Sequence, residues 1–406
     1  MLRLIKTVKA ISIIENYCAE NEIFLEEKLT PKTKLIEELG LNSIDIVAIV
    51  KSAEEVYQKK KNLIELLMPT EGNYRDDIDP KTIEEFFTGK NNTETGKKKR
   101  YSRELPTYEE FMTTQKAVRI DQWNDTELEI DYEIIFILSS PRSGSTLLQN
   151  ILCQNYEIKG SEELHLLAYD TYKRREKSLS DEKLKHLLDG TGIVRSEITG
   201  MRDDIAKQVD KMYTKDNRPT TTFYQEINKY MKGKALIDKT PSYGYSLEVL
   251  RRMNKLFPRA KYIHLKRDPR GCIKSMLDAK LQRIIPFTQG LRIEESKIPE
   301  ILWQMCETNI KAFKNESNHQ QWLNLTYEDL LNNTREELER ISKFIGKTVS
   351  LEDNEDNTKT GRFNKHFAGD MKYLLQKGIQ PSRGNAWKEF EELTKVSNYT
   401  IKLMGG

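Results

Sequence analysis

The stretch EIIFILSSPRSGSTLLQNILCQN (residues 133–155) decides the fold. Residues 134–138 form a continuous apolar run, which is typical of a strand buried in a parallel sheet. The small residues of SSPRSGST (139–146) follow, and an apolar helical periodicity begins after them. A loop of small residues between a strand and a helix brings backbone N–H groups together on one anion. The stretch therefore predicts an anion-binding loop in an α/β domain.

Three later stretches have the same strand character. They are KALIDKT (234–240), AKYIHLKRD (260–268) and QWLNLTYEDL (321–330), with long helical stretches between them. Strands that alternate with helices are typical of a doubly wound parallel sheet. We therefore expect a P-loop-like parallel sheet flanked by helices, in a domain over residues 132–406.

The first 90 residues predict a separate, small, all-α domain of four helices. Residues 8–18 have helical apolar spacing, and a broad apolar face follows Ser43 at the start of another helix. A last helix begins near Pro80 and carries Phe87 on its apolar face. Between the two domains, residues 91–131 are polar and Lys-rich at first and contain Tyr108, Phe111 and Trp123 later. We interpret them as a linker and a segment that packs on the second domain.

Composition excludes several classes of protein. The 406 residues have a formal net charge of +3, which argues against a strongly basic nucleic-acid-binding protein. Residues 1–90 are mildly acidic, with 13 Lys+Arg against 17 Asp+Glu, and the remainder is mildly basic, with 53 against 46. The four cysteines are widely separated without a CxxC pair, so neither a disulfide framework nor a metal site is indicated. The widely spaced cysteines fit a reducing, cytoplasmic location. No apolar run reaches 18 residues, so we expect no membrane span.

The string LGLNSIDIV (39–47) resembles the phosphopantetheine attachment site of acyl carrier proteins. That family attaches the group to a serine in a Gly-Leu-Asp-Ser-Leu type motif, and Ser43 is the matching residue. Asn42 stands where the family usually has Asp. The resemblance covers about residues 5–90 and implies 4′-phosphopantetheine on Ser43, loaded by a phosphopantetheinyl transferase. A phosphodiester there would meet the positive end of the helix. From the residues alone, Ser43 also fits a plain helix N-cap.

The loop at residues 139–146 is similar to the 5′-phosphosulfate loop of sulfotransferases that use 3′-phosphoadenosine-5′-phosphosulfate (PAPS). Its PRSGST string is the form found in tyrosylprotein sulfotransferases and many bacterial sulfotransferases. A nucleoside-triphosphate loop needs GxxxxGK[ST], and the Gly-Lys-Thr at 346–348 lacks the first glycine. The resemblance implies that PAPS is bound by Arg142, Ser143, Gly144, Ser145 and Thr146.

A second signal is YIHLKRDPRGCIKS (262–275), in which Arg267 ends a strand and Ser275 follows eight residues later. Members of the sulfotransferase family use such an Arg and Ser to bind the 3′-phosphate of PAPS. Taken alone, Arg267 beside Asp268 also fits a structural ion pair. Tyr327, in LTYEDLL (325–331), matches a string near the nucleotide, and residues 369–390 resemble the C-terminal closing segment of bacterial members. The whole resemblance covers roughly residues 132–395.

Catalytic candidates come from two further matching strings, GSEELHLL (160–167) and IDKTPSYG (237–244). Sulfuryl transfer needs positive charge beside the leaving group and a base for the acceptor hydroxyl. Arg142 and Lys239 are the candidates for the charge. Glu163, which lies 21 residues after Arg142 as the family's catalytic glutamate does, is favoured as the base, and His165 is the alternative. In an extended segment, positions i and i+2 face the same side, so both side chains would reach one hydroxyl.

The leading functional hypothesis is sulfation of a hydroxyl on an acyl chain that phosphopantetheine holds on Ser43, in polyketide or lipid biosynthesis. Other biosynthetic enzymes would then be partners, since the chain has no GxSxG motif for a thioesterase step. Tethering favours this version because it gives the substrate a high effective concentration. The alternatives are a sulfotransferase for a free small molecule or lipid, a non-catalytic carrier or docking protein, and a P-loop kinase.

Overall fold

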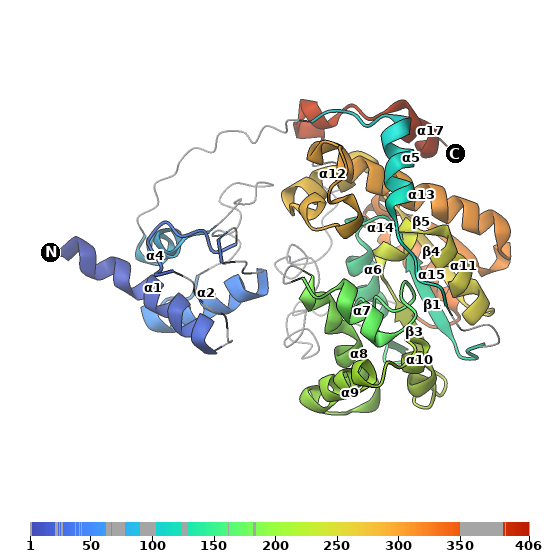
Figure 1. Cartoon of the computed structure of the whole chain (residues 1–406), viewed down its shortest axis with the longest axis horizontal. Helices are drawn as coiled ribbons and strands as arrows, with labels where there is room; N and C mark the ends of the chain where they lie inside the picture. Colours follow the sequence, from blue (N-terminus) through green and yellow to red (C-terminus); the bar gives the residue numbers. More distant parts are fainter. Residues whose placement is uncertain are drawn as a thin grey trace. The chain divides into compact units, whose positions relative to one another are not determined.

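The computed structural model of this chain describes most of its residues. They are residues 2–20, 23, 25, 27–36, 38–39, 41, 43–61, 66, 78–89, 103–123, 129–160, 162–181, 184–349, 385 and 387–405. For residues 2–8, 43, 44 and 47 the backbone alone is described. The described residues divide into two units, the first within residues 1–100 and the second from residue 101 onward (Figure 1).

The first unit is helical, as predicted. Its described helices are α1 (Leu2–Glu20), α2 (Ser43–Tyr57) and α4 (Pro80–Thr88). Asp79 caps α4 by accepting a 2.7 Å hydrogen bond from the Thr82 amide, and Pro80 occupies the first turn. The apolar faces of the three helices meet in one cluster, in which Ile14, Ile49 and Phe87 are fully buried. This unit therefore has a hydrophobic core of its own.

A five-stranded parallel sheet forms the centre of the second unit, in the order β2-β3-β1-β4-β5. Its strands are β1 (Ile134–Leu138), β2 (Ile158–Lys159), β3 (Ala235–Asp238), β4 (Lys261–Lys266) and β5 (Trp322–Thr326). All five residues of β1 are buried, as the continuous apolar run predicts. The three other predicted strands are confirmed as β3, β4 and β5. The two-residue β2 was not predicted, because two residues show no periodicity.

Helices surround this sheet (Figure 1). They are α5 (Tyr108–Ala117), α6 (Ser145–Leu152), α7 (Tyr172–Ser178), α8 (Gly190–Thr199), α9 (Asp203–Lys215), α10 (Thr221–Asn228), α11 (Leu247–Leu256), α12 (Pro269–Asp278), α13 (Ile298–Glu316), α14 (Tyr327–Asn332), α15 (Thr334–Ile345) and α17 (Asn398–Met404). Helix α15 is capped by Gly346 in the left-handed conformation, so the Gly-Lys-Thr at 346–348 follows a helix and not a strand. None of the described helices is both long and apolar enough to cross a membrane.

The described part of the segment before β1, residues 103–123 and 129–133, packs on the rest of the second unit. Phe111 of α5 is buried in the main core and contacts Tyr399 of α17, with the ring centroids 4.9 Å apart and the ring planes tilted by 51°. Arg103 pairs with the buried carboxylate of Glu300 in α13. The other oxygen of Glu300 accepts a 2.7 Å hydrogen bond from the Ser397 amide. These contacts join the segment before β1, α13 and the C-terminal helix.

Candidate active site

Contacts between residues of the loop that joins β1 and α6 hold it in one conformation. Ser140 and Ser143 are buried, and their hydroxyls lie 2.7 Å apart. Arg142 and Gly144 both have positive φ, at 66° and 89°. A Cβ at position 144 would overlap the ring of Tyr327, so the close approach of this ring requires glycine. Among the described side chains none caps the N-terminus of α6, and the first amides of this helix follow directly on the loop.

Arg142 of this loop meets Arg267, which follows β4, and Ser275 of α12. Arg142 Nε donates to Ser275 Oγ over 3.0 Å, and Arg267 Nη1 donates to the Arg142 carbonyl over 2.8 Å. The Arg267 guanidinium also lies 4.3 Å from the ring centroid of Tyr327. The arrangement places two guanidinium groups, a hydroxyl and an aromatic ring around the predicted anion-binding loop.

Cys272 is a contributor that the sequence reasoning missed. Its sulfur is fully buried and lies 3.4 Å from Ser143 Oγ and 3.6 Å from Ser140 Oγ. Burial raises the pKa of this thiol to about 11, so it stays protonated and packs as a small apolar side chain beneath the loop. The cysteine stands in the quoted RDPRGCIKS string, but only the fold shows that α12 brings it under the loop.

Glu163, His165 and Lys239 form the second part of the site. Lys239 Nζ donates to Glu163 Oε1 over 2.6 Å and to Thr146 Oγ1 over 3.3 Å. Lys239 therefore joins Glu163 to the first turn of α6. His165 Nε2 lies 3.1 Å from Glu163 Oε2, and His165 Nδ1 lies 3.2 Å from the hydroxyl of Ser242.

The segment that carries Glu163 and His165, residues 163–167, has no regular secondary structure and is called the turn below, whereas the sequence argument assumed extended backbone. His165 has φ 48°, in the left-handed region that residues other than glycine seldom adopt. The two side chains still reach each other, but through this turn and not through the alternation of a strand. Ser242 was quoted in the IDKTPSYG string without a role, and the structure adds it as a partner of His165.

Glu163 is ionised under ordinary conditions. Burial opposes its ionisation, but Lys239 and then His165 outweigh that cost and lower its pKa to about 2. Its side chain remains 27% exposed, while that of Lys239 is 3% exposed. The carboxylate is thus charged, held by two donors and reachable from solvent.

Sheet topology explains why these groups meet. Strands β3 and β4 lie on either side of β1, and all three are parallel. Their carboxyl ends therefore share one edge of the sheet, where a doubly wound fold binds its ligands. The loop follows β1, Lys239 follows β3 and Arg267 follows β4.

The residues present fit the nucleotide donor that the sequence implies. Arg267 Nε and Ser139 Oγ are buried and have no hydrogen-bond partner among the described residues. A buried guanidinium N–H without an acceptor is costly unless a ligand or water supplies one. The N–H and O–H groups gathered around the loop belong to Arg142, Ser143, Gly144, Ser145, Thr146, Arg267 and Ser275, and the ring of Tyr327 lies beside Arg267.

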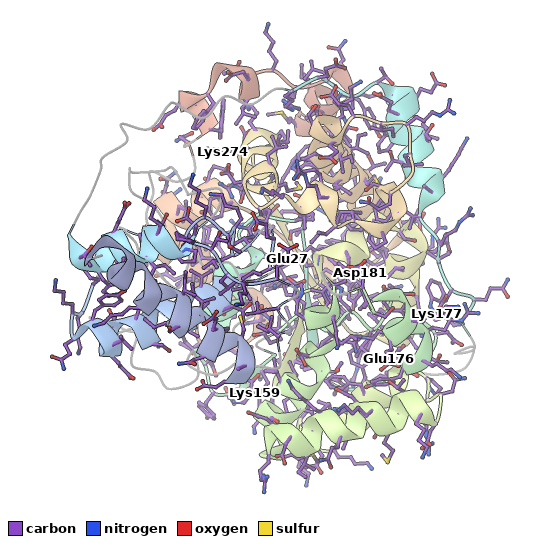
Figure 2. All side chains as sticks on the ribbon, turned by 60° about the vertical axis from the view of Figure 1, so that its left-hand side comes forward. Glu27, Lys159, Glu176, Lys177, Asp181 and Lys274 are labelled. Atoms are coloured by element: carbon purple, nitrogen blue, oxygen red, sulfur yellow. The ribbon has the colours of Figure 1, made fainter. Side chains whose placement is uncertain are left out.

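The C-terminal segment packs on another face of α12. Arg270 lies 3.9 Å from the ring centroid of Trp387, and Lys274 lies 4.9 Å from that of Phe390. Lys274, which is labelled on α12 in Figure 2, also donates to Asp278 over 2.9 Å. This segment is thus attached to the helix that carries Ser275.

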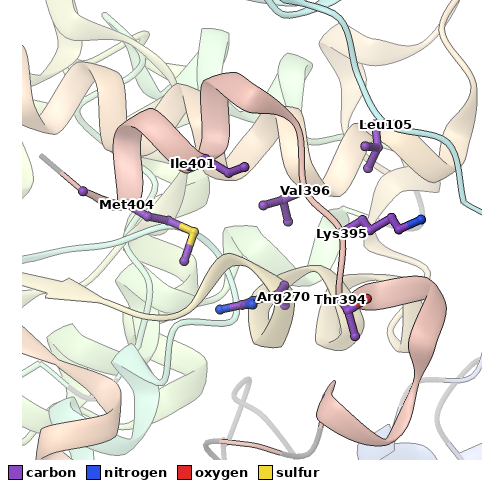
Figure 3. Close-up of a pocket in the computed structure, with 8 residues that line it drawn as sticks. Leu105, Arg270, Thr394, Lys395, Val396, Ile401 and Met404 are labelled. Atoms are coloured by element: carbon purple, nitrogen blue, oxygen red, sulfur yellow. The ribbon is translucent and has the colours of Figure 1, made fainter.

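A cavity of about 600 Å³ lies between α12 and the C-terminal helix (Figure 3). Its walls include Leu105, Arg270, Val396 and Met404. None of the predicted site residues lines this cavity, so it is separate from the candidate active site.

In the first unit, Ser43 is the first residue of α2, as the sequence predicts. Its side chain lies outside the described part of the chain, and so does Asn42. Asp45 in the first turn accepts a 2.7 Å hydrogen bond from the hydroxyl of Tyr17 in α1.

Solved structures of two sulfotransferase domains are similar to this chain. A sulfotransferase domain from an olefin synthase of Synechococcus PCC 7002 is 29% identical; the match covers 70% of this chain and 98% of that domain, with a TM-score of 0.59. A sulfotransferase domain from the curacin biosynthetic pathway is 25% identical over 67% of this chain and 96% of that domain, with a TM-score of 0.58. No curated protein sequence matches the chain significantly.

A family model described as "Sulfotransferase family" matches residues 134–350. The match begins at β1 and ends just after α15, so it contains the loop, Glu163, Lys239 and Arg267. This chain belongs to the sulfotransferase family.

Proposed function

We propose that this chain transfers a sulfuryl group from PAPS to a hydroxyl of an acyl chain, and that phosphopantetheine on Ser43 carries this acyl chain. When bound, PAPS supplies the activated sulfuryl group and leaves as 3′-phosphoadenosine-5′-phosphate. Arg142, Arg267 and Ser275 would bind its phosphates, together with the first amides of α6.

One observation carries the proposal. Lys239 Nζ contacts both Thr146 at the start of α6 and the carboxylate of Glu163. A single ammonium group thus lies between the anion-binding loop and a candidate base. This is where sulfuryl transfer needs positive charge, because negative charge develops on the leaving oxygen.

Glu163 is the base in this proposal. It is ionised and partly exposed, whereas both ring nitrogens of His165 already have partners, Glu163 and Ser242. A carboxylate held by Lys239 is a weak base, but its pKa rises when the ammonium turns toward the transferring group. His165 then orients Glu163 through its Nε2 atom.

The proposed carrier role rests on the first unit. The LGLNSIDIV string lies at the start of a helix in a small domain with a core of its own. The two solved domains come from an olefin synthase and from the curacin biosynthetic pathway, which supports a role in a biosynthetic pathway of that kind. A tethered substrate also gains effective concentration at the active site.

Intact-protein mass spectrometry tests the proposal. The purified chain is incubated with a phosphopantetheinyl transferase and a hydroxyacyl-coenzyme A, and PAPS is then added. We expect an acyl-phosphopantetheine gain in mass, followed by a further gain equal to the mass of one SO3 group. A Ser43→Ala variant is the matched control and should show neither gain.

The outcomes separate the alternatives. Loading without the second gain, while PAPS still binds, would mean that the acceptor is a free molecule or another acyl chain. No loading of the wild-type chain would refute the carrier role and leave the sulfotransferase assignment in place.

A further inference from the structure

The turn that carries Glu163 and His165 has no regular secondary structure, yet Leu164, Leu166 and Leu167 are fully buried. Buried backbone amides and carbonyls need partners. Here side chains supply the hydrogen-bond partners, both for the carbonyls and for the amides. Arg175 donates to the carbonyls of Leu164 and His165 over 2.9 and 3.1 Å.

Two hydroxyls accept the N–H groups of four consecutive residues in this turn. Thr240 Oγ1 lies 3.2 Å from the Leu164 nitrogen and 3.4 Å from the His165 nitrogen. The Tyr243 hydroxyl lies 3.0 and 3.2 Å from the nitrogens of Leu166 and Leu167. Each hydroxyl oxygen accepts hydrogen bonds from two amides, so its own proton must point elsewhere.

Both protons point to one carboxyl, that of Asp238 at the end of β3. Thr240 donates to Asp238 Oδ1 over 2.9 Å, and Tyr243 donates to Oδ2 over 3.2 Å. Tyr224 of α10 donates to the same Oδ2 over 2.6 Å, and within the described part of the chain its hydroxyl makes no hydrogen bond to the turn. Asp238, Thr240 and Tyr243 are each 1% exposed.

We propose that Asp238 is a positioning residue for the transfer reaction, which it serves by orienting the hydroxyls of Thr240 and Tyr243 that hold the turn of Glu163 and His165. This inference rests on the proposed function. An acceptor-only carboxylate fixes the direction of both hydroxyls, because each can then offer only lone pairs to the amides. The strained φ of His165 persists because this network and Arg175 over-determine the turn.

Two tyrosines form a matched pair for the test. Tyr243→Phe and Tyr224→Phe each remove one buried hydroxyl and one hydrogen bond to Asp238. Only Tyr243→Phe also removes the acceptor of the Leu166 and Leu167 amides. We expect Tyr243→Phe to lower kcat by about 10²-fold, since small misplacements of a catalytic group have effects of this size. We expect Tyr224→Phe to lower kcat by about threefold at most.

Thr240 gives an independent test through rescue. Thr240→Val should lower kcat by about 10-fold or more, and Thr240→Ser, which restores the hydroxyl, should recover most of it. Asp238→Asn should act in the same direction, because its amide group forces one hydroxyl to reverse. For each variant the dissociation constant for 3′-phosphoadenosine-5′-phosphate and the melting temperature are measured beside kcat and KM. Hydrogen exchange of the 164–167 amides, read by mass spectrometry, should be faster in Tyr243→Phe than in Tyr224→Phe.

The proposal is overturned if the two tyrosine variants lose kcat equally, if Thr240→Ser fails to recover it, or if the losses appear only in nucleotide affinity or melting temperature. A wild-type chain that transfers no sulfuryl group would instead overturn the proposed function. Hydrogen exchange needs no activity, so in that case equal exchange in the two tyrosine variants would also refute the role of Tyr243 in holding the turn.

Discussion

Glu163 and Lys239, 76 residues apart in the chain, form an ion pair of 2.6 Å. Lys239 directly follows β3, and Glu163 lies in the turn after β2, the strand beside β3. The pair therefore depends on the strand order of the sheet. It also determines the charge state of Glu163, because Lys239 makes the largest favourable contribution to its ionisation.

Glu163→Gln should lower turnover by roughly 10²–10⁴-fold, because glutamine cannot accept the proton of the acceptor hydroxyl. Affinity for 3′-phosphoadenosine-5′-phosphate should stay nearly unchanged. Steady-state kinetics and calorimetry measure the two quantities, and His165→Asn serves for comparison. Near-normal turnover of Glu163→Gln would transfer the base role to His165.

Lys239→Met should raise the pKa of Glu163, because burial then disfavours the ionised carboxylate and the Lys239 ammonium no longer stabilises it. In the wild-type chain this pKa is lowered from 4.5 to about 2, so Glu163 stabilises the fold above pH 4.5 and loses that contribution as pH falls toward 2. NMR titration of ¹³C-labelled glutamate measures the shift. An unchanged pKa in the variant would contradict the ion pair.

Asp238 should make stability depend on pH in the opposite sense. Burial raises its pKa from 3.8 to about 6. Hydrogen bonds from Tyr224, Thr240 and Tyr243 oppose this rise, and so does the charge of His165. The buried Tyr132 lies nearby. Its contribution is fully present below pH 3.8 and is lost as pH rises through 6.

Asp238→Asn has no such ionisation. The free energy of unfolding of the variant, relative to wild type, should therefore rise by about 2 kcal/mol between pH 4 and pH 7. Urea titrations at several pH values measure this difference. A difference that does not change with pH would contradict the raised pKa.

Gly144→Ala should weaken binding of 3′-phosphoadenosine-5′-phosphate by about 10-fold or more, because the added Cβ would push Tyr327 away from the loop. Gly200→Ala is a matched control: φ there is 74°, and nothing lies within 4 Å of a Cβ. Both variants should lose about 1 kcal/mol of stability from backbone strain. Equal nucleotide affinity in the two variants would show that the contact with Tyr327 has no role in binding.

The sequence predicts the strands of this fold well where apolar runs are long. Residues 134–138 are buried without interruption, and β3, β4 and β5 lie inside the predicted stretches. The two residues of β2 are too few to show a pattern, although β2 sets the position of the turn with Glu163.

The side-chain network around this turn was beyond sequence reasoning. Glu163, His165 and Lys239 were found through a family resemblance, but the hydroxyl of Thr240 meets amides 75 and 76 residues earlier. Which hydroxyl meets which amide depends on the packing of η2 (Pro241–Tyr245) beside β1, and no spacing rule encodes it. The positive φ of His165 likewise follows from partners that are distant in the chain.

Within the described part of the chain, the apolar cluster of the first unit consists of residues between positions 10 and 87. A segment with a closed core of this kind can fold by itself, and gene fusion or fission can then move it as one piece. The covalent joining of the two units would thus be an evolutionary option and not a folding requirement. Equivalent pairs encoded as two separate genes would be expected in other genomes, with the helical partner supplied as a free-standing protein.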